Sequence, residues 1–142
     1  MTTHLKPLGF TLIEILTVLL IISLLALMAY PNYMHYIHKS NRLDAANSLF
    51  HYQALWQQCL LNTPKADDCL QEIGLGNSQT QASLSSHYQI SAQINEPLII
   101  FNAKPVLNQQ KDEACAHFTL DNLGTMMAYD TQLQITTKTC WS

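Results

Sequence analysis

The residue with the clearest chemical demand is Glu14, an acid inside an otherwise apolar run near the start of the 142-residue chain. The run, residues 10–30, is long enough to cross a bilayer, whose core needs about 20 apolar residues. A carboxylate within such a helix costs about 2.5–3.5 kcal/mol and needs a partner. No Lys, Arg or His lies within the run. The partner is therefore a positive group on another molecule or a newly made amine.

Four cysteines follow the run, so they share one side of any membrane that it crosses: Cys59, Cys69, Cys115 and Cys140. An even number in a small domain is typical of two disulfides on an oxidising side. Of the three connectivities, we favour Cys59–Cys69 with Cys115–Cys140, because each pair brackets a loop that otherwise lacks a core. The rival is a zinc site, but no CxxC or CxxH spacing indicates one.

Other side chains that chemistry could use are His35, His38, His51, His117, Asp67 and Asp68. The first two histidines have metal-ligand spacing on a helix but no third ligand, which favours a polar surface. The adjacent acids favour a solvated loop, and the remaining histidines have no nucleophile as a partner. We therefore predict no catalytic, cofactor-binding or metal-binding residue, no cofactor and no enzymatic role.

The motif Gly9-Phe10-Thr11-Leu12-Ile13-Glu14 resembles the processing site of type IV prepilins and the related pseudopilins. The resemblance implies that a prepilin peptidase cuts between Gly9 and Phe10 and methylates Phe10. It also implies that Glu14 pairs with the N-terminal amine of a neighbouring subunit during assembly. One departure is Pro7-Leu8 before the glycine, where a basic residue is commonly closer; we expect slower processing.

The resemblance divides the chain into three parts. Residues 1–9, with the cation Lys6, would be a cytoplasmic leader, in agreement with the positive-inside tendency. Residues 10–30 would be the transmembrane and polymerisation helix, and residues 31–142 the periplasmic or extracellular head. The chain would begin in the inner membrane as a single-pass protein and end in a pilus fibre on the cell surface.

Beyond the apolar run, Pro31 predicts a helix kink, because proline removes a hydrogen bond and clashes with the preceding turn. Apolar residues then recur at helical spacing to about residue 61, in a stripe that predicts packing on a sheet: Ala45, Leu49, Tyr52, Trp56 and Leu60. Polar residues lie off that stripe: Asn41, Arg42, Asp44, Ser48, Gln53 and Gln57. Residues 64–86 predict a loop with a short helical turn near residues 68–73.

Four later segments predict strands: residues 88–94, 98–101, 118–120 and 125–129, with a turn at 121–124 and a short edge piece at 133–137. The predicted class is α+β, the type IV pilin fold, with one long N-terminal helix packed on a small antiparallel sheet. The C-terminal stretch from Cys115 to the final Cys140-Trp141 pair is most similar to PilE-type minor pilins.

These features predict a structural and assembly subunit of a type IV pilus, a minor pilin. Its expected partners are other pilin subunits, the prepilin peptidase, the inner membrane and the pilus assembly platform. The alternatives are a type II secretion pseudopilin and a pilus-tip module that binds DNA or surfaces. Only 12% of residues are charged and the net charge is −3, so the composition predicts no strong nonspecific nucleic-acid binding but leaves room for a small local basic patch. DNA binding has thin support, from Lys104, Lys111 and Lys138.

Overall fold

The computed structural model describes residues 9–141, so the predicted leader lies outside the described residues except for Gly9. The chain divides into two compact units between Tyr36 and Ile37. We describe each unit by itself. From here on, the head means the second unit, which begins at Ile37.

The first unit is the N-terminal part of helix α1, Leu12–Leu60. Thr11 caps the helix: the backbone N–H of Glu14 donates to its side-chain Oγ1 (3.3 Å) and to its carbonyl oxygen (3.1 Å). This is half of a capping box, in which Ser or Thr precedes Glu by three residues. By length and composition, α1 contains a segment that could span a membrane. Pro31 lies inside α1, and the kink there stays a prediction.

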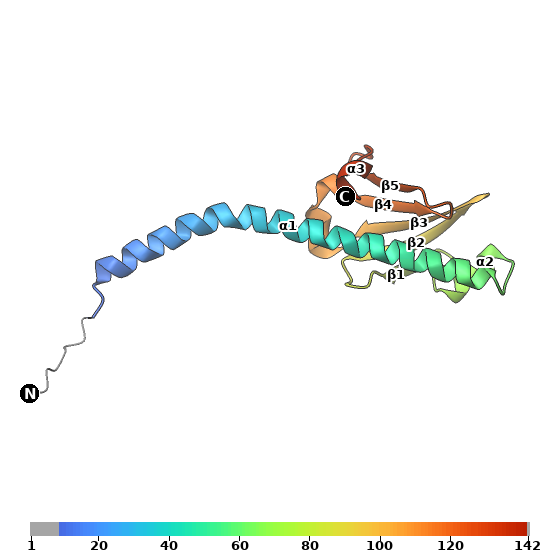
Figure 1. The fold of residues 1–142 in the computed structure, drawn as a ribbon, viewed down its shortest axis with the longest axis horizontal. Helices are drawn as coiled ribbons and strands as arrows, with labels where there is room; N and C mark the ends of the chain where they lie inside the picture. The colour runs from blue at the N-terminus through green and yellow to red at the C-terminus, as the bar shows by residue number, and fades with distance from the viewer. Residues whose placement is uncertain (1–8, 142) are drawn as a thin grey trace, which may run out of the picture. The chain divides into compact units, whose positions relative to one another are not determined.

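The head pairs the later part of α1 with a five-stranded antiparallel sheet in the order β1-β2-β3-β4-β5 (Figure 1). The strands are β1 Thr80–Ala82, β2 Tyr88–Asn95, β3 Leu98–Pro105, β4 His117–Asp121 and β5 Met126–Tyr129. The other elements are α2 Ala66–Glu72, the 3-10 turns η1 Leu107–Lys111 and η2 Glu113–Cys115, and α3 Thr137–Cys140. The α+β pilin fold predicted from the sequence is confirmed.

The core lies between α1 and one face of the sheet. The stripe residues Ala45, Leu49 and Trp56 are buried, as the helical spacing predicted. Trp56 packs edge-on against Phe101 of β3, with ring centroids 6.2 Å apart. Each fully buried large apolar side chain contributes about 1.5–3 kcal/mol. Buried and more exposed residues alternate along β2, so its apolar side chains point at the helix.

Three details differ from the sequence interpretation. The short helical turn predicted within residues 64–86 is present as helix α2, but the same segment also contains the extra strand β1, whose residues are all exposed and carry no alternating apolar pattern. The predicted edge piece makes only one bridge, Tyr129 with Ile135, before helix α3 begins. Finally, four polar residues off the apolar stripe are buried rather than solvent-facing: Arg42, Asp44, Ser48 and Gln53. Each finds hydrogen-bond partners in the head, which removes the usual cost of burying polar groups.

Candidate functional site

The N-terminal motif presents its functional groups openly. Phe10 is 79% exposed, and an added Cβ at Gly9 would meet no atom within 4 Å. Within residues 9–141, no hydrogen bond or ion pair joins the Glu14 carboxylate to another side chain. A shallow apolar hollow of about 260 Å³ lies beside Phe10 and Glu14. The single chain therefore leaves this carboxylate available to a partner outside it.

The four cysteines form two disulfides, Cys59–Cys69 and Cys115–Cys140. The first ties the end of α1 to α2, and the second ties η2 to α3. All four sulfur-bearing residues are buried. Because Cys115 is bonded to Cys140, it is no thiol nucleophile for the nearby His117.

A buried ion pair joins α1 to the C-terminal part of the head. The guanidinium of Arg42 donates from Nε to Oδ2 of Asp112 (2.8 Å) and from Nη2 to Oδ1 (2.9 Å). Its Nη1 also donates to the carbonyl oxygen of Thr139 (3.3 Å). Both charged residues are less than a tenth exposed. The bidentate contact to Asp112 suits a planar guanidinium, and with the Thr139 contact it holds the junction between η1 and η2 and helix α3 on one residue of α1.

Gln109 extends this ion pair into a network. Its Nε2 lies within hydrogen-bond distance of three acceptors: Asp112 Oδ2 (3.1 Å), the Tyr88 hydroxyl (3.0 Å) and the His38 carbonyl (3.2 Å). Its Oε1 accepts from Asn41 Nδ2 (3.1 Å). Burial raises the pKa of Tyr88 far above its ordinary range, so its hydroxyl stays neutral. We refer to Arg42, Gln109, Asp112 and Thr139 as the Arg42 cluster.

A second polar contact fixes the turn between β1 and β2. Asp44 accepts hydrogen bonds from the Ser83 hydroxyl and from the backbone N–H of Ser85 (2.9 Å). Ser48, one turn later on α1, accepts from the N–H of Leu84 (3.1 Å). Two buried polar residues of the helix thus hold this turn against α1.

Four exposed lysines gather at one end of the head: Lys39, Lys104, Lys111 and Lys138. We call this surface the lysine end. Lys104 lies near the end of β3, beside the first residues of β2, because Gln89 is its partner in the sheet register. Lys39 lies on α1, one helical turn before Arg42. Topology therefore brings to one end basic residues that are up to 99 positions apart in sequence.

The positions of Lys111 and Lys138 follow from the Arg42 cluster, because each lysine is next in sequence to a residue that accepts from Arg42. Lys111 directly precedes Asp112, one acceptor of the Arg42 side chain. Lys138 directly precedes Thr139, the other acceptor. Both lysines are exposed while their neighbours are held at one guanidinium. Among the described residues, the nearby acids that pair with no lysine or arginine are exposed Glu113, half-buried Asp130 and buried Asp44, so the lysine end keeps a small excess of positive charge.

Acidic residues gather at the opposite end, where α2 lies (Figure 1). They are Asp67, Asp68, Glu72 and Glu96, all exposed. A hollow lined by both Asp67 and Asn95 shows that α2 lies beside the end of β2 that leads into the β2–β3 turn. The head therefore carries exposed positive charge at one end of its sheet and exposed negative charge at the other. Nothing in the spacing of these charges along the sequence indicates this, since it arises from strand pairing.

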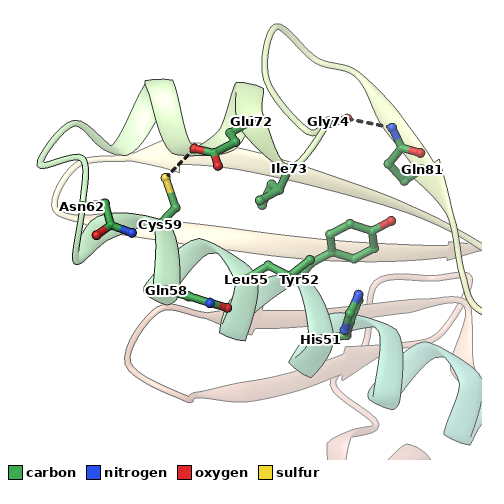
Figure 2. A pocket seen from close by; sticks show the side chains of 10 residues that line it. All are labelled: His51, Tyr52, Leu55, Gln58, Cys59, Asn62, Glu72, Ile73, Gly74 and Gln81. Atoms are coloured by element: carbon green, nitrogen blue, oxygen red, sulfur yellow. Dashed lines mark hydrogen bonds between the residues drawn. The ribbon is translucent and has the colours of Figure 1, made fainter.

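A hollow of about 620 Å³ is lined by residues of α1, α2, β1 and the segment that joins α2 to β1. Figure 2 shows the side chains that line it. Glu72 points its carboxylate at the first disulfide, with Oε2 3.2 Å from Cys59 Sγ. Gln81 Nε2 donates to the carbonyl oxygen of Gly74 (3.1 Å). Burial raises the pKa of Tyr52 in its wall. Two of its polar groups, on Glu72 and Gln81, thus lie against other atoms of the chain.

A second hollow, of about 600 Å³, lies on the sheet face that points away from α1 and is lined by residues of β2 to β5. Here His117 Nε2 lies 3.2 Å from Asn102 Oδ1, and its ring lies 6.1 Å from that of Tyr129. Burial and the positive charge of Lys104 both lower the pKa of His117. The histidine is therefore mainly neutral at neutral pH and is held by an amide.

The remaining residues noted in the sequence do not form a site. His38 Nδ1 lies 3.1 Å from Gln109 Oε1, whereas His35 is exposed. Asp67 and Asp68 lie in the first turn of α2. Among residues 9–141, no group of three or more potential ligands is placed to hold a metal ion. The residues that sequence reasoning missed are the buried polar side chains of α1, because polar identity normally signals exposure.

Comparison with known proteins identifies two segments. Residues 31–119, more than half of the chain, match the family model described as "Type IV minor pilin ComP, DNA uptake sequence receptor". Residues 6–30 match the model of the prokaryotic N-terminal methylation motif. No curated protein matches the chain.

Proposed function

This chain belongs to the type IV minor pilin ComP family, and from that premise we propose that it binds DNA through the lysine end of its head. The family model describes its members as DNA uptake sequence receptors. Pilins are structural subunits, and we propose no catalytic step for this one. The match favours the minor pilin over the alternative of a secretion pseudopilin.

The observation that carries the proposal is the gathering of Lys39, Lys104, Lys111 and Lys138 at one end of the head. A protein that neutralises DNA phosphates releases bound counterions, which gives affinity and a strong salt dependence. The opposite, acidic end would repel DNA, so the molecule has one favourable orientation toward a duplex. Such contacts position the protein, whereas base contacts supply sequence preference.

The test is DNA binding by the full chain in detergent, measured against salt concentration. Duplex fragments from the source genome and from an unrelated genome serve as probes, because a receptor for uptake sequences distinguishes them. With four phosphate contacts, the slope of log K against log [salt] is expected to be about −3.6, and each Lys→Gln change should reduce its magnitude by about 0.9.

Lys65→Gln is the matched control, because Lys65 is exposed but lies at the N-cap of α2 beside the acidic residues. It should leave affinity and slope unchanged. In cells, the combined change of Lys104, Lys111 and Lys138 to Gln should abolish DNA uptake while fibres persist. Unchanged binding by that combined variant would disprove the lysine end as the DNA-binding surface.

We further propose that the chain is cut between Gly9 and Phe10, methylated at Phe10 and assembled through Glu14. The exposed Phe10, the open surroundings of Gly9 and the unpartnered Glu14 carboxylate support this proposal. Cleavage would create a positive amine at Phe10, and pairing that amine with Glu14 of a neighbour would set the register of adjacent helices. The expected partners are a prepilin peptidase, an assembly platform and other pilins, with the chain starting in the inner membrane.

Quantitative mass spectrometry of sheared fibres tests this proposal. The N-terminal peptide should begin at methylated Phe10, and the chain should be far less abundant than the dominant pilin. Glu14→Ala should be processed normally yet be lost from fibres. A processed chain that never enters sheared fibres would instead indicate a priming role or a secretion pseudopilus.

A further inference from the structure

Three tyrosines lie at equal intervals from the last residue of the apolar run of α1 onward. Tyr30, Tyr33 and Tyr36 are 67%, 63% and 72% exposed. Within residues 9–141, none of their rings stacks on another ring and none of their hydroxyl groups has a hydrogen-bond partner. Large aromatic side chains left this open indicate a surface that meets something outside the chain.

The three side chains share one flank of the helix. Successive residues of an α-helix turn by about 100°, so steps of three residues spread the rings over an arc of about 120°. Residues 12–28 before this group are dominated by exposed apolar side chains. The tyrosines therefore mark the place where the apolar surface of α1 ends.

Their depth matches the boundary of a bilayer. At about 1.5 Å per residue, the rise from Leu12 to Tyr30 is about 27 Å, close to the hydrocarbon thickness of about 30 Å. Tyr33 and Tyr36 then lie about 4.5 and 9 Å farther along the axis. The headgroup region adds about 5–7 Å on each side of the core. All three rings thus fall within or at the edge of this region when the apolar run fills the core.

We propose that Tyr30, Tyr33 and Tyr36 bind the lipid headgroup region and fix the depth of the helix before assembly. Tyrosine suits such a boundary, because its ring is apolar and its hydroxyl can hydrogen-bond to headgroups and water. The inference rests on the proposed membrane insertion. It adds a reason for the position of the cleavage site, because Gly9 lies three residues before the start of α1 at Leu12, at the end of the apolar run opposite the tyrosines.

The test uses the full chain with 3-fluorotyrosine, in bicelles of phosphatidylcholine and phosphatidylglycerol. Nitroxide labels are placed either on the lipid headgroup or at the end of the acyl chain, and fluorine relaxation is measured. The chain has six tyrosines, so single Tyr→Phe variants assign the resonances. Tyr52, Tyr88 and Tyr129 of the head serve as internal controls. Flotation with vesicles of the same lipids reports insertion separately.

We expect the headgroup label to broaden the three resonances at least threefold more than the acyl-chain label, with little effect on the head tyrosines. If the protein floats with the vesicles but the headgroup label does not broaden the three tyrosine resonances, the headgroup contact is overturned and the proposed insertion is not. The same holds if the acyl-chain label broadens them more, since the span would then end later. A chain that does not float with the vesicles would overturn the proposed insertion together with it.

Discussion

The sharpest prediction concerns the buried ion pair between Arg42 and Asp112. Arg42→Met keeps most of the side-chain length but removes the charge and the three donors. Asp112 is only 6% exposed and would keep one side-chain hydrogen bond, from Gln109 Nε2. Breaking a buried pair by removing one partner typically costs about 3–5 kcal/mol. We therefore expect the free energy of unfolding to fall by about that amount.

The second half of the prediction concerns the double variant. Asp112→Asn alone leaves the Arg42 charge buried with the Thr139 carbonyl as an acceptor and should also be strongly destabilising. Combining Arg42→Met with Asp112→Asn removes both charges, so the double variant should lose less than the two single changes added together. A coupling energy of about 2–3 kcal/mol is expected from contacting residues in one network.

Urea unfolding of the full chain in detergent measures these values through tryptophan fluorescence. Trp56 and Trp141 both lie in the head, and both contact core aromatic rings. Lys39→Met is the matched control, because it removes an exposed cation one turn earlier and should change stability by less than about 0.5 kcal/mol. The reasoning is refuted if Arg42→Met costs under about 1 kcal/mol or if the single effects simply add.

Two further predictions address the disulfides and pH. Replacing Cys115 and Cys140 by Ser should destabilise the head by about 3.5 kcal/mol and replacing Cys59 and Cys69 by about 2.7 kcal/mol, since the cost grows with loop length; urea unfolding under oxidising conditions would measure both, and a reversed order would contradict the loop argument. Because the pKa of His117 is lowered in the folded state, unfolding takes up a proton, so stability should decline as pH falls from the ordinary histidine value of 6.5 through the folded pKa. His117→Gln should remove that decline, and a variant with an unchanged pH profile would show that other groups cause it.

Patterns local in sequence predicted much of this molecule. The spacing of Ala45, Leu49 and Trp56 located the helical face that packs on the sheet, and alternation located β2. The order of the cysteines, each pair bracketing a loop, favoured the pairing that the structure contains. In each case the information lay within a few turns of helix or a few strand residues, where periodicity follows directly from backbone geometry.

What the sequence could not predict depends on contacts between distant segments. By its residue type and its position off the apolar stripe, Arg42 is expected to face solvent. Its partner Asp112 lies 70 positions later in the sequence. Strand β1 has no apolar face to reveal it. The lysine end becomes visible only when strand pairing places Lys104 near the segments that carry Lys111 and Lys138. The same lysines in sequence gave only thin support for DNA binding, because separated cations have no collective field until the fold assembles them.

The Arg42 cluster links the stability of the head to its proposed contact with DNA. A buried ion pair contributes less to stability than well-packed apolar residues often would, and positional specificity is the better-supported reason for keeping one. Here the pair binds the residues that follow Lys111 and Lys138, so it sets the spacing between two of the four cations. We therefore expect Arg42→Met to weaken DNA binding even under conditions where the head stays folded, although the Arg42 side chain is itself too buried to reach a phosphate. A folded Arg42→Met chain with unchanged affinity would separate the two roles and leave the cluster with a purely structural one.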